Sequence, residues 1–186
     1  MKQNFINQTH FLGVLLPEEL ETEIEGAREY MRTAFGCTSG QKTPLHTTLV
    51  PPFHLSEEFS TQDIVRELEK SFSEEPSLSF TAHISGYDAF GDRTIFAAVE
   101  KASEWTKLRD KTLRAVLAAS PHCTKKDTRP FTPHITVANR DIPQGATTKA
   151  LKVLNENALE ADFKADNIAI FERKNGLWEA NYIVQI

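Results

Sequence analysis

The sequence of 186 residues predicts a mixed α+β fold, and three observations lead to this prediction. Segments with the alternating pattern of β-strands interleave with segments that repeat apolar residues at helical spacing. The segments TPLHTTLV at 43–50 and FTPHITVA at 131–138 place a Thr-Pro and a His-x-Thr pattern in each half of the chain. Neither a Gly/Ser linker nor a low-complexity block divides the sequence. We therefore expect a single domain over residues 1–186, to which each half contributes one functional strand.

The first half shows the pattern of two helices between strands. Residues 11–16 are apolar and predict a strand, and Pro17 begins a helix whose first turn is acidic. The next strand is predicted to end at the Pro-Pro pair 51–52, because proline cannot donate to a sheet ladder. Ser60 followed by Asp63 marks the start of a second helix. The apolar faces of the two helices contain Leu20, Ile24, Ala27, Met31 and Ala34, and then Ile64, Leu68 and Phe72.

The second half continues this alternation. Residues 78–84 alternate between apolar and polar side chains, and residues 93–99 return as a strand after a turn that contains glycine. A third helix is expected at about 103–119, followed by a polar loop and the second His-x-Thr strand.

The end of the chain predicts one more helix and a hairpin. Thr147 or Thr148 is expected to cap the helix, with Leu151 and Leu154 facing inward. The apolar segments 168–171 and 178–184 flank an Asn-Gly turn, which is typical of a β-hairpin.

The composition is that of a globular protein, with 40% hydrophobic and 25% charged residues. No stretch has the apolar length of a membrane span, and the first residues lack the pattern of an export signal. Cys37 and Cys123 are too few for a disulfide framework or a metal cluster. We therefore expect a cytoplasmic monomer that binds no membrane, metal ion or cofactor.

The net charge of −5 argues against a protein that coats long nucleic acids. The charge is uneven, with −9 over residues 1–100, +6 over 101–140 and −2 over 141–186. The basic segment surrounds the second His-x-Thr, so a local positive rim there could attract a phosphate. Four of its basic residues are expected to form only the solvated face of the third helix: Lys107, Arg109, Lys111 and Arg114.

The two His-x-Thr patterns predict a catalytic site. Side chains at positions i and i+2 of a strand share one face, so His46 lies beside Thr48 and His134 beside Thr136. The other face of each strand is largely apolar, which suits burial. Two facing imidazoles can act as general base and general acid, while two hydroxyls donate hydrogen bonds to an anion between them. The pattern therefore predicts phosphoryl chemistry without a metal ion.

The His-x-Thr string alone is a weak signal, because the chain is rich in threonine. A third match, His122-Cys123-Thr124, also follows a proline but runs into Lys125 and Lys126 instead of an apolar strand. We interpret it as a loop. Strand context, the preceding proline and placement in opposite halves distinguish the other two matches.

These segments resemble the two-histidine (2H) phosphoesterase superfamily, which contains the RNA 2′,3′-cyclic phosphodiesterases once called 2′-5′ RNA ligases. Residues 44–53, PLHTTLVPPF, are similar to its first motif, and residues 129–140, RPFTPHITVANR, to its second. Residues 86–99 resemble the strand pair between the motifs. The resemblance implies a bilobal fold, with two antiparallel-rich sheets related by pseudo-twofold symmetry around a central groove and helices outside.

The resemblance also implies a role for each motif residue. His46 and His134 form the acid/base pair of a metal-independent phosphodiesterase, and Thr48 and Thr136 contact phosphate oxygens. The implied substrate is a nucleotide or RNA end with a 2′,3′-cyclic phosphate or a 2′-5′ linkage, with 2′-5′ ligation as the reverse reaction. Which His is the base depends on the direction of the reaction. Activity should then have a bell-shaped pH dependence and persist in the presence of a chelator.

Three further residues are candidates for contacts with the substrate, namely Arg140, Phe53 and Phe90. The family commonly has an arginine five positions after the second His, where this chain has Asn139. On an unbroken strand Arg140 shares the face of His134, whereas Asn139 points away. The Pro-Pro pair shifts Phe53 relative to the usual aromatic of the first motif. For both phenylalanines, packing in the core or in a hairpin is the default interpretation.

Two other classes of function fit the sequence less well. A metallohydrolase would need ligand spacings such as His-x-His, HExxH or a Cys/His cluster, and the sequence lacks them. A non-catalytic module that binds nucleotides or RNA ends would keep the groove, but it would not require the acid/base and hydroxyl pairs, which are intact.

Overall fold

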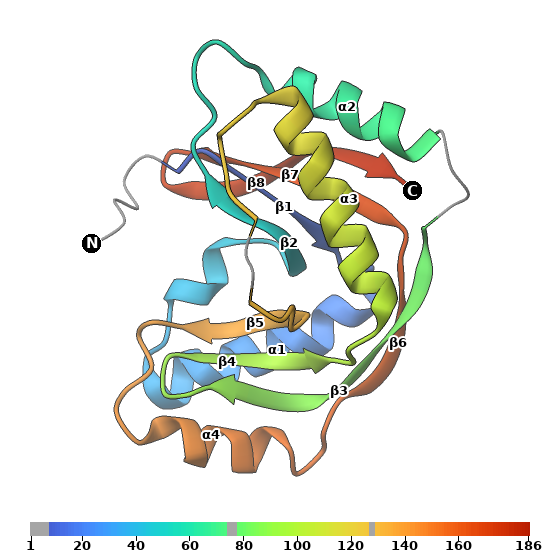
Figure 1. Ribbon diagram of the computed structural model, residues 1–186. Helices are drawn as coiled ribbons and strands as arrows, with labels where there is room; N and C mark the ends of the chain where they lie inside the picture. Colours follow the sequence, from blue (N-terminus) through green and yellow to red (C-terminus); the bar gives the residue numbers. More distant parts are fainter. Residues whose placement is uncertain (1–7, 74–77, 127–128) are drawn as a thin grey trace.

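The computed structural model describes residues 8–73, 78–126 and 129–186 of the chain (Figure 1). Within these ranges eight strands, four α-helices and one short 3-10 helix, η2, follow one another in a mixed order. The elements are β1 (His10–Leu15), α1 (Glu18–Phe35), η2 (Ser39–Lys42), β2 (His46–Phe53), α2 (Thr61–Ser73), β3 (Phe80–Phe90), β4 (Thr94–Val99), α3 (Ser103–Ala119), β5 (His134–Asn139), α4 (Ala146–Leu154), β6 (Glu160–Ala165), β7 (Asn167–Lys174) and β8 (Leu177–Gln185).

The strands form one antiparallel sheet made of two four-stranded halves. The strand order is β6-β3-β4-β5-β2-β1-β7-β8. The halves meet at β5 and β2, which share a single register pair, Thr47 with Ile135. Neighbouring strands within each half pair over longer stretches. The predicted bilobal α+β fold is confirmed, and the two predicted sheets are continuous through this one contact.

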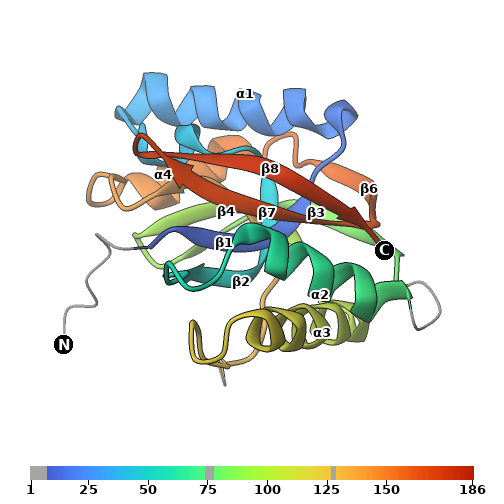
Figure 2. The same cartoon turned by 90° about the horizontal axis from the view of Figure 1, so that it is seen from above.

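Two pairs of helices lie on opposite sides of the strands (Figure 2). Helix α1 packs against β5 and α4, while α3 packs against β2 and α2. Each helix that precedes one His-x-Thr strand therefore packs on the His-x-Thr strand of the other half. This exchange joins the two halves where the sheet itself is weakly paired. None of the helices in the described ranges has the length and apolar character needed to cross a lipid bilayer.

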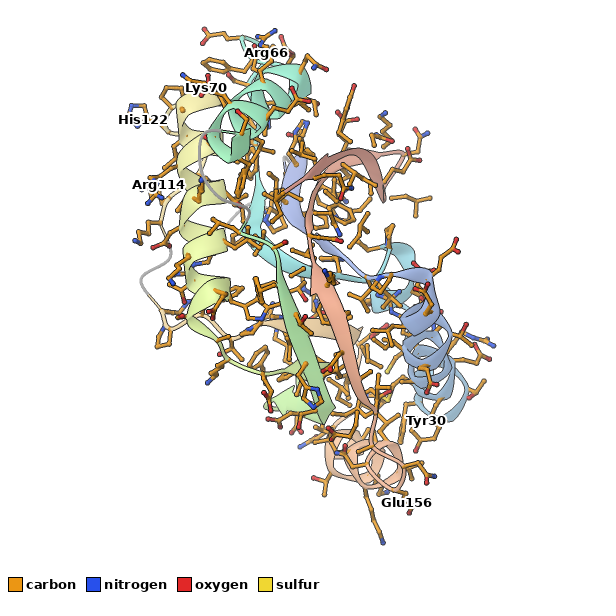
Figure 3. All side chains as sticks on the ribbon, turned by 90° about the vertical axis from the view of Figure 1, so that its right-hand side faces the viewer. Tyr30, Arg66, Lys70, Arg114, His122 and Glu156 are labelled. Carbon is orange, nitrogen blue, oxygen red and sulfur yellow. The ribbon has the colours of Figure 1, made fainter. Side chains whose placement is uncertain are left out.

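The outer and inner faces of the helices differ as the sequence predicts. Figure 3 shows Arg66 and Lys70 of α2 and Arg114 of α3 pointing away from the molecule. On the inner side, Ile24 of α1 and Trp105 of α3 are 0% and 1% exposed. Burial of apolar side chains between helices and sheet fixes which face of β2 and β5 points inward. The other face of these two strands is left to form the site.

Several predicted elements are confirmed. Helix α3 spans the predicted residues, and α2 begins after Ser60, whose hydroxyl donates to Asp63 at 2.7 Å. The final hairpin turns at Asn175 and Gly176, whose φ angles of 51° and 81° suit a two-residue hairpin turn. His122, with a φ of 68°, lies in a loop as expected.

Two expectations about elements are wrong, and one strand was not predicted. Strand β2 continues through the Pro-Pro pair to Phe53, because its pairing with β1 is irregular there and needs no proline N–H. The cap of α4 is Gly145 with a φ of 73°, and Thr147 is buried inside the helix. Strand β6 was not predicted, although its sequence EADFKA alternates charged and apolar residues; it is short and lies at the edge of the sheet.

Candidate active site

The two His-x-Thr strands lie side by side where the halves of the sheet meet. Their middle residues, Thr47 and Ile135, pair in antiparallel register. The residues on either side of this pair are therefore opposite each other and share one face. Each His lies across from the Thr of the other strand, which gives the pairs His46 with Thr136 and Thr48 with His134.

The opposite face of both strands is buried, which confirms the predicted assignment of faces. Leu45, Thr47 and Leu49 of the first motif are 2%, 0% and 2% exposed. Ile135 and Val137 of the second are 0% and 1% exposed, while all four motif His and Thr residues are half-buried. The alternation of a pleated strand thus presents two imidazoles and two hydroxyls together.

The backbone fixes the same tautomer in both imidazoles. Nδ1 of His46 lies 2.7 Å from the carbonyl oxygen of Pro44, and Nδ1 of His134 lies 2.8 Å from that of Thr132. A carbonyl oxygen only accepts hydrogen bonds, so each Nδ1 carries the hydrogen and each Nε2 keeps its lone pair. Both rings can therefore accept a proton at Nε2.

The aromatic surroundings of the two imidazoles differ. The ring of His46 lies 4.8 Å from the rings of both Phe11 and Phe171, which are buried. His134 meets Phe90 edge-on at 5.0 Å, and Phe90 is 44% exposed. His46 thus packs between two buried rings, whereas His134 packs beside the exposed Phe90 and the buried Phe96, whose ring centre is 5.2 Å away.

Both imidazoles are held in their neutral form. Burial, as the larger cause, and the positive charge of Arg28 together lower the pKa of His46 to about 4, while the hydrogen bond to the carbonyl of Pro44 opposes this shift. Burial also lowers the pKa of His134, and the carbonyl of Thr132 opposes this shift. Neutral imidazoles at neutral pH suit proton acceptance.

Arg28 of α1 is a functional candidate that the sequence analysis missed. Its side chain is 3% exposed and lies at the bottom of the site, where Nη1 donates to the carbonyl oxygen of Thr43 at 3.0 Å. Nε and Nη2 both donate to the carbonyl oxygen of Thr136, at 3.3 and 3.2 Å, and Glu25 accepts from Nη1 at 2.8 Å. One guanidinium therefore ties the start of the first motif to the second motif.

Two glycines allow other segments to approach the site closely. A Cβ on Gly13 of β1 would lie 2.7 Å from the carbonyl oxygen of Thr47 and 3.3 Å from Cδ2 of His46. A Cβ on Gly40 of η2 would lie 2.8 Å from the carbonyl oxygen of Val137. The approaches of 2.7 and 2.8 Å to carbonyl oxygens are too short for a Cβ, so glycine at these positions lets β1 and η2 border the motifs.

A cavity of about 380 Å³, the motif cavity, lies over the site and is lined by both motif His and both motif Thr residues. Arg28, Asn139 and Arg140 also line it. Among the residues that the structure describes, no three His, Cys, Asp or Glu side chains gather as they would to hold a metal ion. The hydroxyl, imidazole and guanidinium groups of this cavity suit an oxyanion.

The prediction that Asn139 points away is wrong. The pairing of β5 with β4 shifts by one residue between Ile95 and Phe96, so β5 is not an unbroken strand. Beyond the shift, Asn139 is half-buried, lines the motif cavity and accepts from the Thr94 hydroxyl at 3.1 Å. Arg140 also lines the cavity, but it follows the end of the strand with a φ of 73°.

The two candidate phenylalanines lie in different environments. Phe53 is 4% exposed, stacks on His10 with 6.0 Å between ring centres and lines neither cavity at the motifs. Its default interpretation as a core residue holds, because β2 continues to Phe53 and turns it inward, away from both cavities. Phe90 is exposed beside His134 and remains a candidate.

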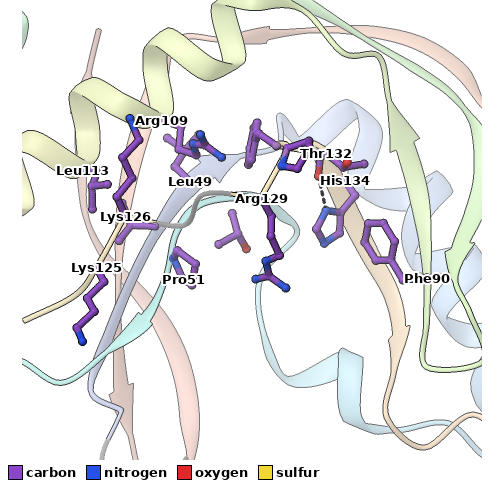
Figure 4. A pocket seen from close by; sticks show the side chains of 14 residues that line it. Leu49, Pro51, Phe90, Arg109, Leu113, Lys125, Lys126, Arg129, Thr132 and His134 are labelled. Carbon is purple, nitrogen blue, oxygen red and sulfur yellow. Dashed lines mark hydrogen bonds between the residues drawn. The ribbon is translucent and has the colours of Figure 1, made fainter. Parts of the chain in front are cut away.

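A second cavity, the basic cavity, adjoins the motif cavity and measures about 330 Å³ (Figure 4). Thr48 and His134 line both cavities. The cations in its lining come from α3 and from the loop before β5, and they are Arg109, Lys125, Lys126 and Arg129. The basic segment predicted around the second motif therefore lies beside His134.

The expectation of a solvated basic face on α3 is only partly correct. Lys107 and Arg114 are exposed. Lys111 is 8% exposed, with its ammonium 4.9 Å from the centre of the Phe72 ring. Arg109 lines the basic cavity. Helix α3 packs between α2 and the loop before β5. This packing covers Lys111 and Arg109, which the helical spacing alone predicts to be exposed to solvent.

Comparisons with known proteins agree with this fold. The sequence matches the family model of the 2′-5′ RNA ligase superfamily over residues 16–177. The chain belongs to this superfamily. The protein TT0787 of Thermus thermophilus has a TM-score of 0.66 at 20% identity, covering 95% of this chain and 97% of that one.

Two more solved structures have the same fold as this member of the 2′-5′ RNA ligase superfamily. E. coli LigT, in a complex with 3′-AMP, has a TM-score of 0.60 at 16% identity and covers 96% of this chain and 95% of its own. A protein described as a phosphoesterase has a TM-score of 0.61 at 15% identity, with 97% and 98% covered. No curated protein sequence gives a significant match. The predicted 2H phosphoesterase family is confirmed, while the roles of its motif residues stay predictions.

Proposed function

We propose that this protein is a metal-independent phosphodiesterase that acts on 2′,3′-cyclic phosphates or 2′-5′ linkages of nucleotides or RNA ends. The observation that carries the proposal is the matched pair of imidazoles at one cavity. Each has its Nδ1 hydrogen bound to a backbone carbonyl, and each keeps a lone pair on Nε2. A reaction with one proton to remove and one to deliver needs two such groups.

With a cyclic phosphate, the two imidazoles act at opposite sides of the phosphorus. Nε2 of one His takes a proton from water as the water oxygen bonds to phosphorus. The other His, protonated beforehand, gives its proton to the ribose oxygen as the phosphorus–oxygen bond breaks. We assign the base to His46, because Arg28 and burial disfavour its charged form. His134 is then the acid, and an anionic substrate favours its protonation.

Two hydroxyl groups and one arginine stabilise the negative charge that forms during the reaction. Phosphorus becomes five-coordinate, and its non-bridging oxygens gain negative charge, which nearby donors stabilise. Thr48 and Thr136 supply hydroxyl donors, and Arg140 supplies a cation at the edge of the cavity. The neighbour LigT is described in complexes with 3′-AMP and with phosphate, ligands that contain the group this site suits.

The test is a turnover assay of the full chain in EDTA, with nucleoside 2′,3′-cyclic phosphates and 2′-5′ dinucleotides as substrates. We expect turnover by the wild type and a loss of about 10²- to 10⁴-fold in His46→Ala and in His134→Ala. His122→Ala, which changes an exposed loop residue, is the matched control and should keep full activity.

Two results would contradict the proposal in different ways. Activity that disappears in EDTA and returns with zinc or manganese would rule out the metal-independent mechanism. A wild-type protein that binds 3′-AMP but turns over none of these esters would instead be a nucleotide-binding module on the same fold.

A further inference from the structure

We propose that the basic cavity binds a second phosphate of the substrate, one that is not cleaved. The inference rests on the proposed function and specifies its substrate class. The preferred substrates are phosphodiesters that carry at least one more phosphate group next to the reacting one. A mononucleoside cyclic phosphate would fill only the motif cavity.

The two cavities form one continuous binding surface. Thr48 and His134 each line both of them, so a ligand held at these residues can extend in either direction. The cavities measure about 380 and 330 Å³. Each is near the lower end of the roughly 300–1,000 Å³ that small-ligand sites occupy. A substrate larger than one small ligand therefore has room in the second cavity.

The charge of this surface selects an anion. The described residues that line the two cavities include six Lys and Arg side chains and no carboxylate, although the whole chain has a net charge of −5. Asp110, just outside, offsets part of this charge, with Arg109 at 3.4 Å and Lys126 at 3.1 Å. A concave surface of one sign raises the local concentration of the opposite charge.

Aromatic rings lie beside the cations of the basic cavity. The Arg109 side chain is 14% exposed and its guanidinium lies 4.9 Å from the centre of the Phe131 ring. Figure 4 shows Arg129 between Lys126 and His134, with Phe90 beyond His134. Guanidinium groups bind phosphate through two parallel hydrogen bonds, and aromatic faces accept a ribose or a base. Both features fit a nucleotide more closely than a simple organic acid.

The second phosphate can come from two sources. In an oligoribonucleotide it is the internucleotide phosphate next to the reacting end, and in a small nucleotide it is a terminal phosphate. The experiment separates them by comparing uridine 2′,3′-cyclic phosphate with its 5′-phosphorylated form and with the dinucleotide UpU that ends in a 2′,3′-cyclic phosphate. We expect kcat/KM to be about tenfold or more higher for at least one of the two larger substrates.

Variants of the basic cavity should reduce this preference. In Arg129→Gln and Lys125→Gln, kcat/KM should fall about tenfold for the favoured two-phosphate substrate and less for the mononucleotide. The preference should also weaken as salt rises, because a second phosphate contact adds to the salt dependence. Lys152→Gln on the exposed side of α4 removes one positive charge away from both cavities and is the matched control.

A binding measurement keeps this test separate from the test of catalysis. Titration calorimetry compares 3′-UMP with the 3′-phosphorylated dinucleotide UpUp. The wild type should bind UpUp more tightly than 3′-UMP. It should also bind UpUp about tenfold more tightly than Arg129→Gln does. Equal kcat/KM for all three substrates, or equal affinity for the two ligands, would overturn the inference while leaving the phosphodiesterase intact. Tighter binding of UpUp without any turnover would support the inference and refute the proposed function.

Discussion

The two His-x-Thr strands are alike in their hydrogen bonding and unlike in what surrounds them. Both imidazoles donate from Nδ1 to a carbonyl two residues earlier, and both Thr residues face the His of the other strand. The first His, His46, lies between buried rings and near a buried cation. The second, His134, lies beside the exposed Phe90 and the basic cavity.

The shared hydrogen bonding concerns catalysis, and the different surroundings concern how a substrate enters the site. The matched hydrogen bonds give two groups that can exchange roles as base and acid, as a reversible reaction needs. The unmatched surroundings give the site a direction, because His134 lines both cavities, whereas His46 lines the motif cavity. A substrate is thus expected to extend from the motif cavity past His134.

The largest expected effect tests the similarity of the two strands. Thr48→Val and Thr136→Val each remove one hydroxyl donor at constant shape, and each should lower kcat/KM by about 10²- to 10³-fold. Thr47→Val on the same strand is the matched control, since its buried hydroxyl has no hydrogen-bond partner among the described residues and its loss should leave activity unchanged. A large loss in only one of the two Thr variants would break the symmetry.

The next effect concerns Arg28, the guanidinium that connects the two motifs, and the stability of the protein. Arg28→Met removes the guanidinium that joins Thr43 and Thr136 and leaves their carbonyls without these donors. We expect the free energy of unfolding in urea to fall by about 2–4 kcal/mol. Arg32→Met, on the exposed side of the same helix, should leave it close to the wild-type value. Equal stability of the two variants would contradict the bridging role.

The smallest effect compares the two imidazoles by pH. The pKa of His46 is about 4 in the folded state against an ordinary value of 6.5, so the unfolded chain binds the proton first as pH falls through this window. Stability should therefore decrease between pH 7 and pH 5, with about 2 kcal/mol from His46. Urea unfolding at both pH values checks this.

Variants assign the pH effect to one residue. Stability should decrease less between pH 7 and pH 5 in His46→Gln than in His134→Gln. The reason is that burial lowers the pKa of both imidazoles, and the larger shift is that of His46. An unchanged pH dependence in His46→Gln would show that this imidazole is not held neutral.

Local periodicity was enough to predict the strands and the faces of the motif residues. The positions of His46 and Thr48 follow from strict alternation, which the burial of Leu45 and Leu49 confirms. Asn139 was misplaced because one bulge in β5 reverses the alternation after it, and no residue type announces a bulge. The motifs are therefore readable from the sequence up to the first irregularity.

Contacts between distant elements could not be read in the same way. Arg28 lies in a helical pattern that suits an exposed cation, and only the packing of α1 on β5 brings it to the carbonyl of Thr136. Lys111 is covered in the same way by Phe72 of α2. The contacts of these residues depend on which helix of one half packs on which strand of the other. The spacing of residues within one helix does not specify this packing.

The central claim is that the two strands hold one phosphorus between two imidazoles. A crystal structure of the full chain with inorganic phosphate in the motif cavity tests it most directly. We predict one phosphate with hydrogen bonds to Nε2 of His46 and of His134, and to the hydroxyls of Thr48 and Thr136. A phosphate that contacts only one of the two strands, or two phosphates bound separately at each motif, would contradict the account.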